Sequence, residues 1–317
     1  MPAQSPSVRE VGDGRILLDL GFRDSEGLIA SYLVPAEEGW TLVETGPGSC
    51  RLRLLDGIRQ AGVDRQEILR VFVTHIHLDH SGGLGALEES FPRAHFYAHR
   101  EGVAHLVDPA KLIASARRTW GVAADPLWGP IIPVHPSRLT ALNGGEQFPV
   151  REGTLHVLDT PGHAKHHLAF FDSRPRALFT GDGAGVRLEG SGRARPAVPP
   201  PDLDLEKLFS SLEAMKRLEP RLLLYSHFGP LAGGARELDE YRTAVTEWRD
   251  VALAAAREEA SIPHVARALR EFEERVTAER QLPAPGVEQA VLVSSFEVAA
   301  MGLLRYFQQR EPPTGSG

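Results

Sequence analysis

Three histidines and one aspartate occur within six positions of the sequence, immediately after an apolar run. The segment reads THIHLDHSGG (residues 74–83) and follows Val71, Phe72 and Val73. Residues 70–75 predict a buried strand, and side chains two positions apart on an extended chain share a face. We therefore expect His75 and His77 to point the same way from the carboxyl end of this strand, where ligands gather in open α/β sheets. With Asp79 and His80, they form two pairs of donors, enough to serve two neighbouring metal ions.

Three further donors follow apolar runs elsewhere in the chain. His163 ends LHVLDTPGH, Asp182 ends ALFTGD and His227 ends LLLYSH. A lone histidine after a strand is more often a core or surface residue, but a buried ionisable group needs a partner, and the set as a whole favours a metal centre. The predicted ligands are His75, His77, Asp79, His80, His163, Asp182 and His227.

Cysteine content and net charge restrict the classes of function. Cys50 is the only cysteine, which excludes disulfide scaffolds and thiolate zinc sites within one chain. The formal net charge of -7 argues against a general nucleic-acid binder. Residues 1–15 lack the apolar core of a secretory signal, and Glu288 and Glu297 interrupt the most apolar segment, residues 287–307. We expect no nucleic-acid partner, no membrane span and a cytoplasmic location.

Apolar patterning divides the chain into two parts. Strands and helices alternate up to about residue 232, with an inserted helix and a proline-rich loop at residues 101–138. Three helical segments follow, at about residues 234–258, 262–281 and 286–309. This pattern predicts a catalytic domain at residues 1–232 and a helical C-terminal extension at residues 233–317. The extension either covers part of the cleft or forms a homodimer interface.

Four motifs in order, THIHLDHSGG, DTPGHAKHH, FTGDG and YSHFGP, resemble those of the metallo-β-lactamase fold superfamily. The resemblance covers about residues 14–230 and implies an α/β fold, the four-layer αββα sandwich, with a dinuclear metal site at one edge. It implies that His75, His77 and His163 bind one ion, that Asp79, His80 and His227 bind the other, and that Asp182 bridges them.

Several positions depart from the patterns of particular branches of this superfamily. Glu44, in LVETGPG, stands where many members have aspartate, so its longer side chain is expected to change how a ligand histidine is oriented. No tyrosine closely follows Asp182, unlike the acyl-homoserine lactonases, and His77 stands where flavodiiron proteins have glutamate. No cysteine follows the second motif, unlike the zinc-dependent antibiotic lactamases that use one. The chain looks most similar to glyoxalase-II-like hydrolases.

This resemblance implies a metal-dependent hydrolase that uses a hydroxide held at the dinuclear site to cleave a small thioester, ester or lactone. The expected cofactor is a pair of divalent ions, zinc in the first place, with iron or manganese also compatible with nitrogen and oxygen donors. Asp79 would orient the hydroxide and move a proton. One alternative is a persulfide-dioxygenase-like oxidoreductase with a single iron, and another is a phosphodiesterase or nuclease.

Candidate substrate contacts are fewer and rest on position alone. Tyr225 precedes the last ligand histidine, His135 lies inside the proline-rich loop, and Arg187 belongs to a short basic segment. Trp120 and Trp128 flank the same loop and either line an apolar acyl pocket or pack in the core. The substrate is expected to be a small molecule.

Overall fold

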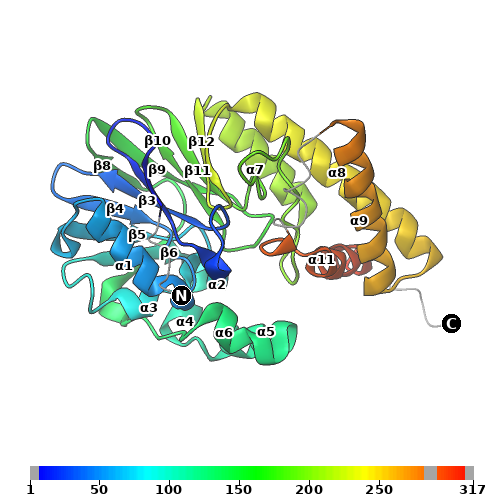
Figure 1. Cartoon of the computed structure of the whole chain (residues 1–317), viewed down its shortest axis with the longest axis horizontal. Helices are drawn as coiled ribbons and strands as arrows, with labels where there is room; N and C mark the ends of the chain where they lie inside the picture. The colour runs from blue at the N-terminus through cyan, green and yellow to red at the C-terminus, as the bar shows by residue number, and fades with distance from the viewer. Residues whose placement is uncertain (1–6, 282–290, 311–317) are drawn as a thin grey trace.

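Two β-sheets lie face to face, and helices cover the outer face of each (Figure 1). The computed structural model describes residues 7–281 and 291–310. The seven strands of the first sheet are, in order, β1 (Val8–Glu10), β2 (Ile16–Asp19), β3 (Ala30–Pro35), β4 (Trp40–Val43), β5 (Ile68–Phe72), β6 (His95–His99) and β7 (Leu139–Leu142). The six strands of the second are, in order, β13 (Gly229–Ala232), β12 (Leu222–Tyr225), β11 (Ala177–Gly181), β10 (Leu168–Asp172), β9 (Gly153–Asp159) and β8 (Gln147–Val150).

The first sheet changes once from antiparallel to parallel pairing. Neighbouring strands from β1 to β4 are antiparallel, whereas those from β4 to β7 are parallel. In the second sheet only β11 and β12 run parallel. The helices are α1 (Arg51–Gln60), α2 (Leu78–Ser81), α3 (Leu84–Leu87), α4 (Arg100–Val107), α5 (Ala110–Trp120), α6 (Ala124–Trp128), α7 (Leu205–Arg217), α8 (Ala235–Glu258), α9 (Ile262–Glu279) and α11 (Phe296–Gln308).

Strands β10 and β11 of the second sheet are buried on both faces. In β10, Leu168 and Phe170 belong to the core that joins the two sheets, whereas Ala169 and Phe171 belong to the cluster beneath the C-terminal helices. This follows from the alternation of side chains along a strand. The ring of Phe170 lies 5.3 Å from that of Phe72 in the first sheet. The expected four-layer αββα sandwich is confirmed.

The C-terminal helices share a hydrophobic cluster with the outer face of the second sheet (Figure 1). Trp248 of α8 is fully buried and stacks on Phe296 of α11, with ring centroids 5.7 Å apart. Arg193, from the connection after β11, forms ion pairs with Glu247 of α8 and Glu273 of α9. α8 and α9 match the first two predicted C-terminal helices, and α11 lies inside the third, whose first residues, 286–290, fall outside the described ranges.

The inserted region differs from its prediction in detail. Pro109 separates α4 from α5, so the single expected helix is two. The segment expected to be an irregular loop contains the five-residue helix α6. No helix in the described ranges combines the length and the apolar character that crossing a bilayer requires.

Candidate metal centre

The seven predicted ligands follow the carboxyl ends of four strands. His75 and His77 come after β5 and lead into α2, which carries Asp79 and His80. His163 follows β9, Asp182 directly follows β11, and His227 follows β12. The two sheets bring these ends to one edge of the sandwich. There the ligand atoms form three groups of three, within each of which all atoms lie within 4.8 Å of one another: His75, His77 and His163; His75, His80 and Asp182; and Asp79, His80 and His227.

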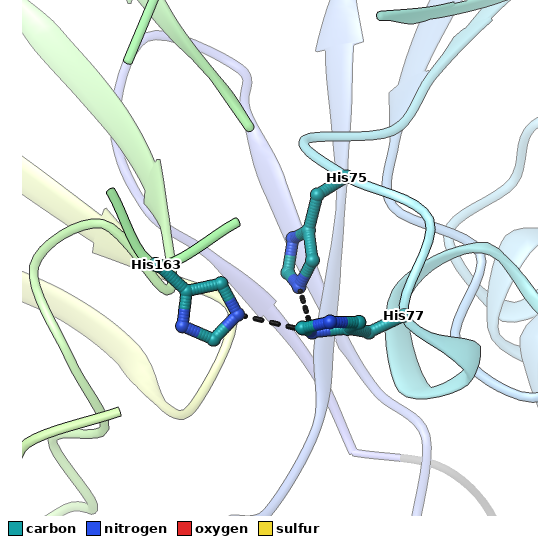
Figure 2. Close-up of side chains that lie close together, drawn as sticks. All are labelled: His75, His77 and His163. Atoms are coloured by element: carbon teal, nitrogen blue, oxygen red, sulfur yellow. Dashed lines mark hydrogen bonds between the residues drawn. The ribbon is translucent and has the colours of Figure 1, made fainter. Parts of the chain in front are cut away.

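The first group consists of three histidines whose ring nitrogens converge (Figure 2). His75 Nε2 lies 2.9 Å from His77 Nδ1, and His163 Nε2 lies 3.0 Å from the same His77 nitrogen. His75 and His77 come from the segment after β5, whereas His163 approaches from the second sheet. We refer to these three residues as the first trio.

The second trio is Asp79, His80 and His227. His227 Nε2 lies 3.2 Å from His80 Nε2 and 3.4 Å from Asp79 Oδ2. Asp182 lies between the two trios: its Oδ1 is 3.4 Å from His80 Nε2, and its Oδ2 is 3.6 Å from His163 Nε2. One carboxylate therefore presents a different oxygen to each trio.

Outward hydrogen bonds fix which ring nitrogen of His163 and of His227 carries hydrogen. His163 Nδ1 donates to the Ala197 carbonyl at 2.9 Å, and His227 Nδ1 donates to the Leu28 carbonyl at 2.7 Å. A carbonyl oxygen can only accept, so in the neutral rings both Nε2 atoms are bare acceptors that face inward.

Glu44 orients the ligands from behind the second trio. Its Oε1 accepts hydrogen bonds from His80 Nδ1 at 3.1 Å, from the Thr74 hydroxyl at 2.5 Å and from the Ser226 hydroxyl at 3.1 Å. Because the Thr74 hydroxyl donates to Glu44, it is free to accept from His75 Nδ1, 3.0 Å away. Glu44 also has a positive φ of 67°, which is uncommon for a residue with a side chain.

These contacts leave inward acceptors facing one another. Two neutral imidazoles cannot place bare Nε2 atoms 3.2 Å apart, as His80 and His227 do, unless a proton or a metal ion lies between them. Asp182 Oδ1 is buried and has no hydrogen-bond partner among the described residues. Inward imidazole nitrogens and carboxylate oxygens without thiolates fit zinc, iron or manganese. The fold and this donor set imply divalent metal binding.

The two trios differ in their electrostatics without metal. Burial is the largest cause that lowers the pKa of His77, to about 3, and it also lowers that of His75 well below the usual value. Burial acts in the same direction on His80, but Asp182, Glu44 and Asp79 together outweigh it and raise the pKa of His80 well above its usual value. Burial raises the pKa of Asp79, yet His80 and His227 overcome it and hold that pKa at about 2. Without metal, the histidines of the second trio therefore hold protons more tightly than His75 and His77 do.

Glycines allow the ligand loops to approach other elements closely. Gly181, with φ of 49°, precedes Asp182, and a Cβ there would lie 2.6 Å from both His167 Nε2 and Thr74 Oγ1. Gly162, before His163, packs so tightly on α7 that a Cβ would lie 2.3 Å from the Cα of Leu208. A side chain at either position would displace the ligand that follows it.

His166 and His167 lie beside the metal centre, although no motif singled them out as ligands. His167 Nε2 accepts from the Gly183 amide at 3.1 Å, and its Nδ1 lies 2.8 Å from the Thr160 hydroxyl, so His167 holds the loop that carries Asp182. His166 lines the cavity described next. Their place in DTPGHAKHH, within four positions of His163, was the available sequence signal.

A cavity of about 400 Å³ opens beside the two trios. His77, Asp79, His163 and Asp182 lie on one side of it. The other walls come from α5 and α6, from residues 197–202 and from residues 292–301, which include the start of α11. Trp120 and Trp128 both line it, with ring centroids 5.7 Å apart. Part of the C-terminal region therefore covers the metal centre.

The structure does not bring the three candidate substrate contacts into this cavity. Tyr225 is fully buried in the cluster on the outer face of the second sheet. His135 is exposed, and its ring accepts a hydrogen bond from the Ser137 amide. Arg187 lies with Arg9 in a separate surface depression. None of the three lines the cavity at the metal centre.

Comparison with known proteins identifies the same superfamily that the sequence motifs resemble. The family model described as Metallo-beta-lactamase superfamily matches residues 10–227. Uncharacterized protein YobT of Bacillus subtilis (strain 168) is 30% identical over 205 residues, which are 62% of this chain and 81% of that protein. Hydroxyacylglutathione hydrolase of Synechococcus sp. (strain JA-2-3B'a(2-13)) is 28% identical over 152 residues, 48% of this chain but only 46% of the hydrolase.

A solved structure extends the likeness beyond the ligand motifs. The crystal structure of a beta-lactamase domain protein from Burkholderia ambifaria matches with a TM-score of 0.67 and 22% identity, and the match covers 100% of this chain and 94% of that one. At this identity the likeness concerns the fold alone. Because the family match spans well over half of the 317 residues, the chain belongs to the metallo-beta-lactamase superfamily.

Proposed function

We propose that the protein is a hydrolase of an acyl thioester, ester or lactone that works with two divalent ions, zinc in the first place. The first trio binds one ion, the second trio binds the other, and Asp182 bridges them. The observation that carries the proposal is the position of Asp182, whose two oxygens face different trios at 3.4 and 3.6 Å. When bound, such ions activate water and polarise a carbonyl.

The residues of the chain then have distinct roles. Glu44 and the carbonyls of Ala197 and Leu28 hold the imidazoles in the tautomers that leave Nε2 free. Asp79 is the least buried of the carboxylates here, with 17% of its side chain exposed, and it lines the cavity. Its carboxylate accepts a hydrogen bond from the attacking water and moves the proton toward the leaving group.

Support for an acyl substrate comes from the relatives and from the cavity. One relative is named hydroxyacylglutathione hydrolase, and its substrate, by that name, is an acyl derivative of the thiol glutathione. The chain spans about half the length of that protein, so the chemistry is carried over as a proposal. The apolar walls at Trp120 and Trp128 suit an acyl chain more than a strongly polar substrate.

The test combines metal analysis with a substrate panel. Protein reconstituted with zinc, and separately with iron, is assayed on esters, thioesters, lactones and phosphodiesters, with His77→Ala as the control that removes a ligand. We expect two zinc ions per chain and turnover of acyl substrates that His77→Ala abolishes. One iron per chain with oxygen consumption on a persulfide would instead support the oxidoreductase, and turnover of phosphodiesters alone would support a phosphodiesterase.

A further inference from the structure

The cavity extends well past the metal centre and is large enough for more than the group that is cleaved. Its volume of about 400 Å³ falls in the usual range for small-molecule sites. Only one side carries metal-centre residues, and the opposite walls belong to α5 and to the segment leading into α11. These walls are candidates for recognising the rest of the substrate.

His166 directs a hydrogen-bond donor into this cavity. The residue is 6% exposed, and the Ile76 amide donates to its Nδ1 at 3.4 Å. The hydrogen of the neutral ring is therefore on Nε2. The Asp202 carboxylate lies 3.9 Å from Nε2, too far for a hydrogen bond, and Nε2 has no such partner within residues 7–281 and 291–310. The N–H therefore faces the cavity, where an acceptor on a bound molecule can take its hydrogen bond.

The border of the cavity is positively charged, although the protein as a whole carries a net charge of -7. Lys111 and Arg118 of α5 and Lys165 line it, against Asp202, which lies 4.0 Å from Lys165. Neither Lys111 nor Arg118 forms an ion pair with any residue that the structure describes. Seven positions apart, they share a face of α5 and lie about 10 Å apart along its axis.

Apolar residues line much of the rest of the cavity. Trp128 stacks on Phe22, with ring centroids 5.9 Å apart, and Leu292 and Val293 line the wall contributed by the C-terminal region. The cavity thus combines an apolar wall, one N–H donor from His166 and two cations without an ion-pair partner in the described part of the chain. It matches a molecule that is apolar near the cleaved bond and anionic at its far end.

We propose that the substrate is an acyl thioester or ester that carries an anionic group, a carboxylate or a phosphate, which Lys111 and Arg118 bind while His166 donates a hydrogen bond to an oxygen of the acyl portion. This inference rests on the proposed hydrolase function for the placement of the acyl carbonyl. It extends that function by assigning a second recognition site to α5 and a specificity role to His166.

The test uses zinc-loaded full-length protein and acyl thioesters of equal length that end in a carboxylate, a phosphate or a neutral amide. We expect kcat/KM to favour one of the anionic substrates about tenfold over the amide, and the carboxylate and phosphate arms identify which anion is preferred. Lys111→Gln/Arg118→Gln should remove this preference by raising KM. Arg117→Gln is the matched control, because Arg117 neighbours Arg118 but pairs with Asp125 and does not line the cavity.

His166 needs its own variants and a readout that does not depend on turnover. His166→Leu should raise KM about tenfold for all three substrates with metal content unchanged, and His166→Gln, which keeps a donor, should recover part of the loss. Binding of alkyl carboxylates and alkyl phosphates is followed in parallel by tryptophan fluorescence, since Trp120 and Trp128 line the cavity.

The outcomes separate this inference from the proposed function. If no acyl substrate is cleaved, the hydrolase proposal fails, and the fluorescence titration alone decides the anion site. Binding or turnover that is equal for anionic and neutral ligands, and equal in wild type and Lys111→Gln/Arg118→Gln, overturns the inference. Loss of metal in His166→Leu would show that His166 supports the ligands and would overturn its specificity role.

Discussion

Replacing Glu44 by glutamine tests whether one buried carboxylate sets the affinity of the second metal site. Glu44 is 1% exposed, its Oε1 accepts three hydrogen bonds, and its Oε2 lies 3.4 Å from the Thr74 amide. A glutamine amide has only one acceptor oxygen, so Glu44→Gln forces its NH₂ group toward at least one of these donors. The contact most directly tied to metal binding is the one to His80 Nδ1.

The expected loss of metal affinity in Glu44→Gln follows from the role of Glu44 as the partner of His80. Removing the partner that orients a ligand histidine typically lowers metal affinity about 10- to 100-fold, which corresponds to about 1.4–2.7 kcal/mol. The second ion should be affected most, because His80 belongs to the second trio. His163 of the first trio is held by the Ala197 carbonyl and has no contact with Glu44.

Zinc competition with a chromophoric chelator measures both sites in one titration. We expect Glu44→Gln to release one zinc at a chelator concentration at least tenfold lower than wild type does, with the other zinc shifted less. Glu26→Gln, at an exposed glutamate, is the control. If folded Glu44→Gln binds both ions as tightly as wild type, the charge of the Glu44 carboxylate does not set the affinity of the second site and the reasoning is refuted.

Three further predictions address the pH dependence of metal binding, the support behind the first trio and the stability of the fold. Because carboxylates raise the pKa values of His80 and His227 in metal-free protein, metal competes with protons there, so affinity should fall as pH decreases; calorimetry in two buffers of different ionisation enthalpy should show proton release, and its absence would mean that these carboxylates do not raise the two pKa values. Tyr241→Phe removes the hydroxyl that accepts from the Ala197 amide at 3.3 Å; we expect several-fold weaker binding of one ion, seen as a change in the cobalt absorption spectrum, and an unchanged spectrum would argue against this support. Arg15→Met leaves Asp172, which is 0% exposed, without its partner; urea denaturation should show a loss of about 3–5 kcal/mol in the free energy of unfolding, and a loss below 1 kcal/mol would mean that Asp172 is otherwise stabilised.

That the seven donors converge could be expected from the sequence, because each donor is positioned by the strand that precedes it. Each donor follows an apolar strand, and strand ends meet at the edge of a sandwich, so residues as distant in the chain as His75 and His227 converge once the sheets form. The family resemblance implied that Glu44 orients a ligand histidine, without indicating which one, and in the structure Glu44 contacts His80. What sequence could not predict was the set of outward partners, because Ala197 and Leu28 contribute backbone carbonyls that carry no residue-type signal.

The residues that line the cavity were predicted less well than the metal ligands, for two different reasons. Tyr225 alternates with Leu224, which faces the core between the sheets, so the period of the strand already directs Tyr225 to the outer face. The cavity wall at residues 292–301 depends instead on how α11 folds back over the second sheet, and helical periodicity does not encode that. His166 shows the same limit, since only its contact with the Ile76 amide turns its Nε2 toward the cavity.

Much of the cavity wall comes from stretches of chain that carry none of the candidate metal ligands. The ligands lie between His75 and His227, whereas much of the apolar and cationic wall belongs to α5 and to residues beyond 291. Substitutions in α5 or beyond residue 291 can therefore change the shape and charge of the cavity while leaving the candidate metal ligands in place. Conversely, a chain shortened at residue 232 would keep every ligand yet lose one side of its binding site and the layer that shields the second sheet.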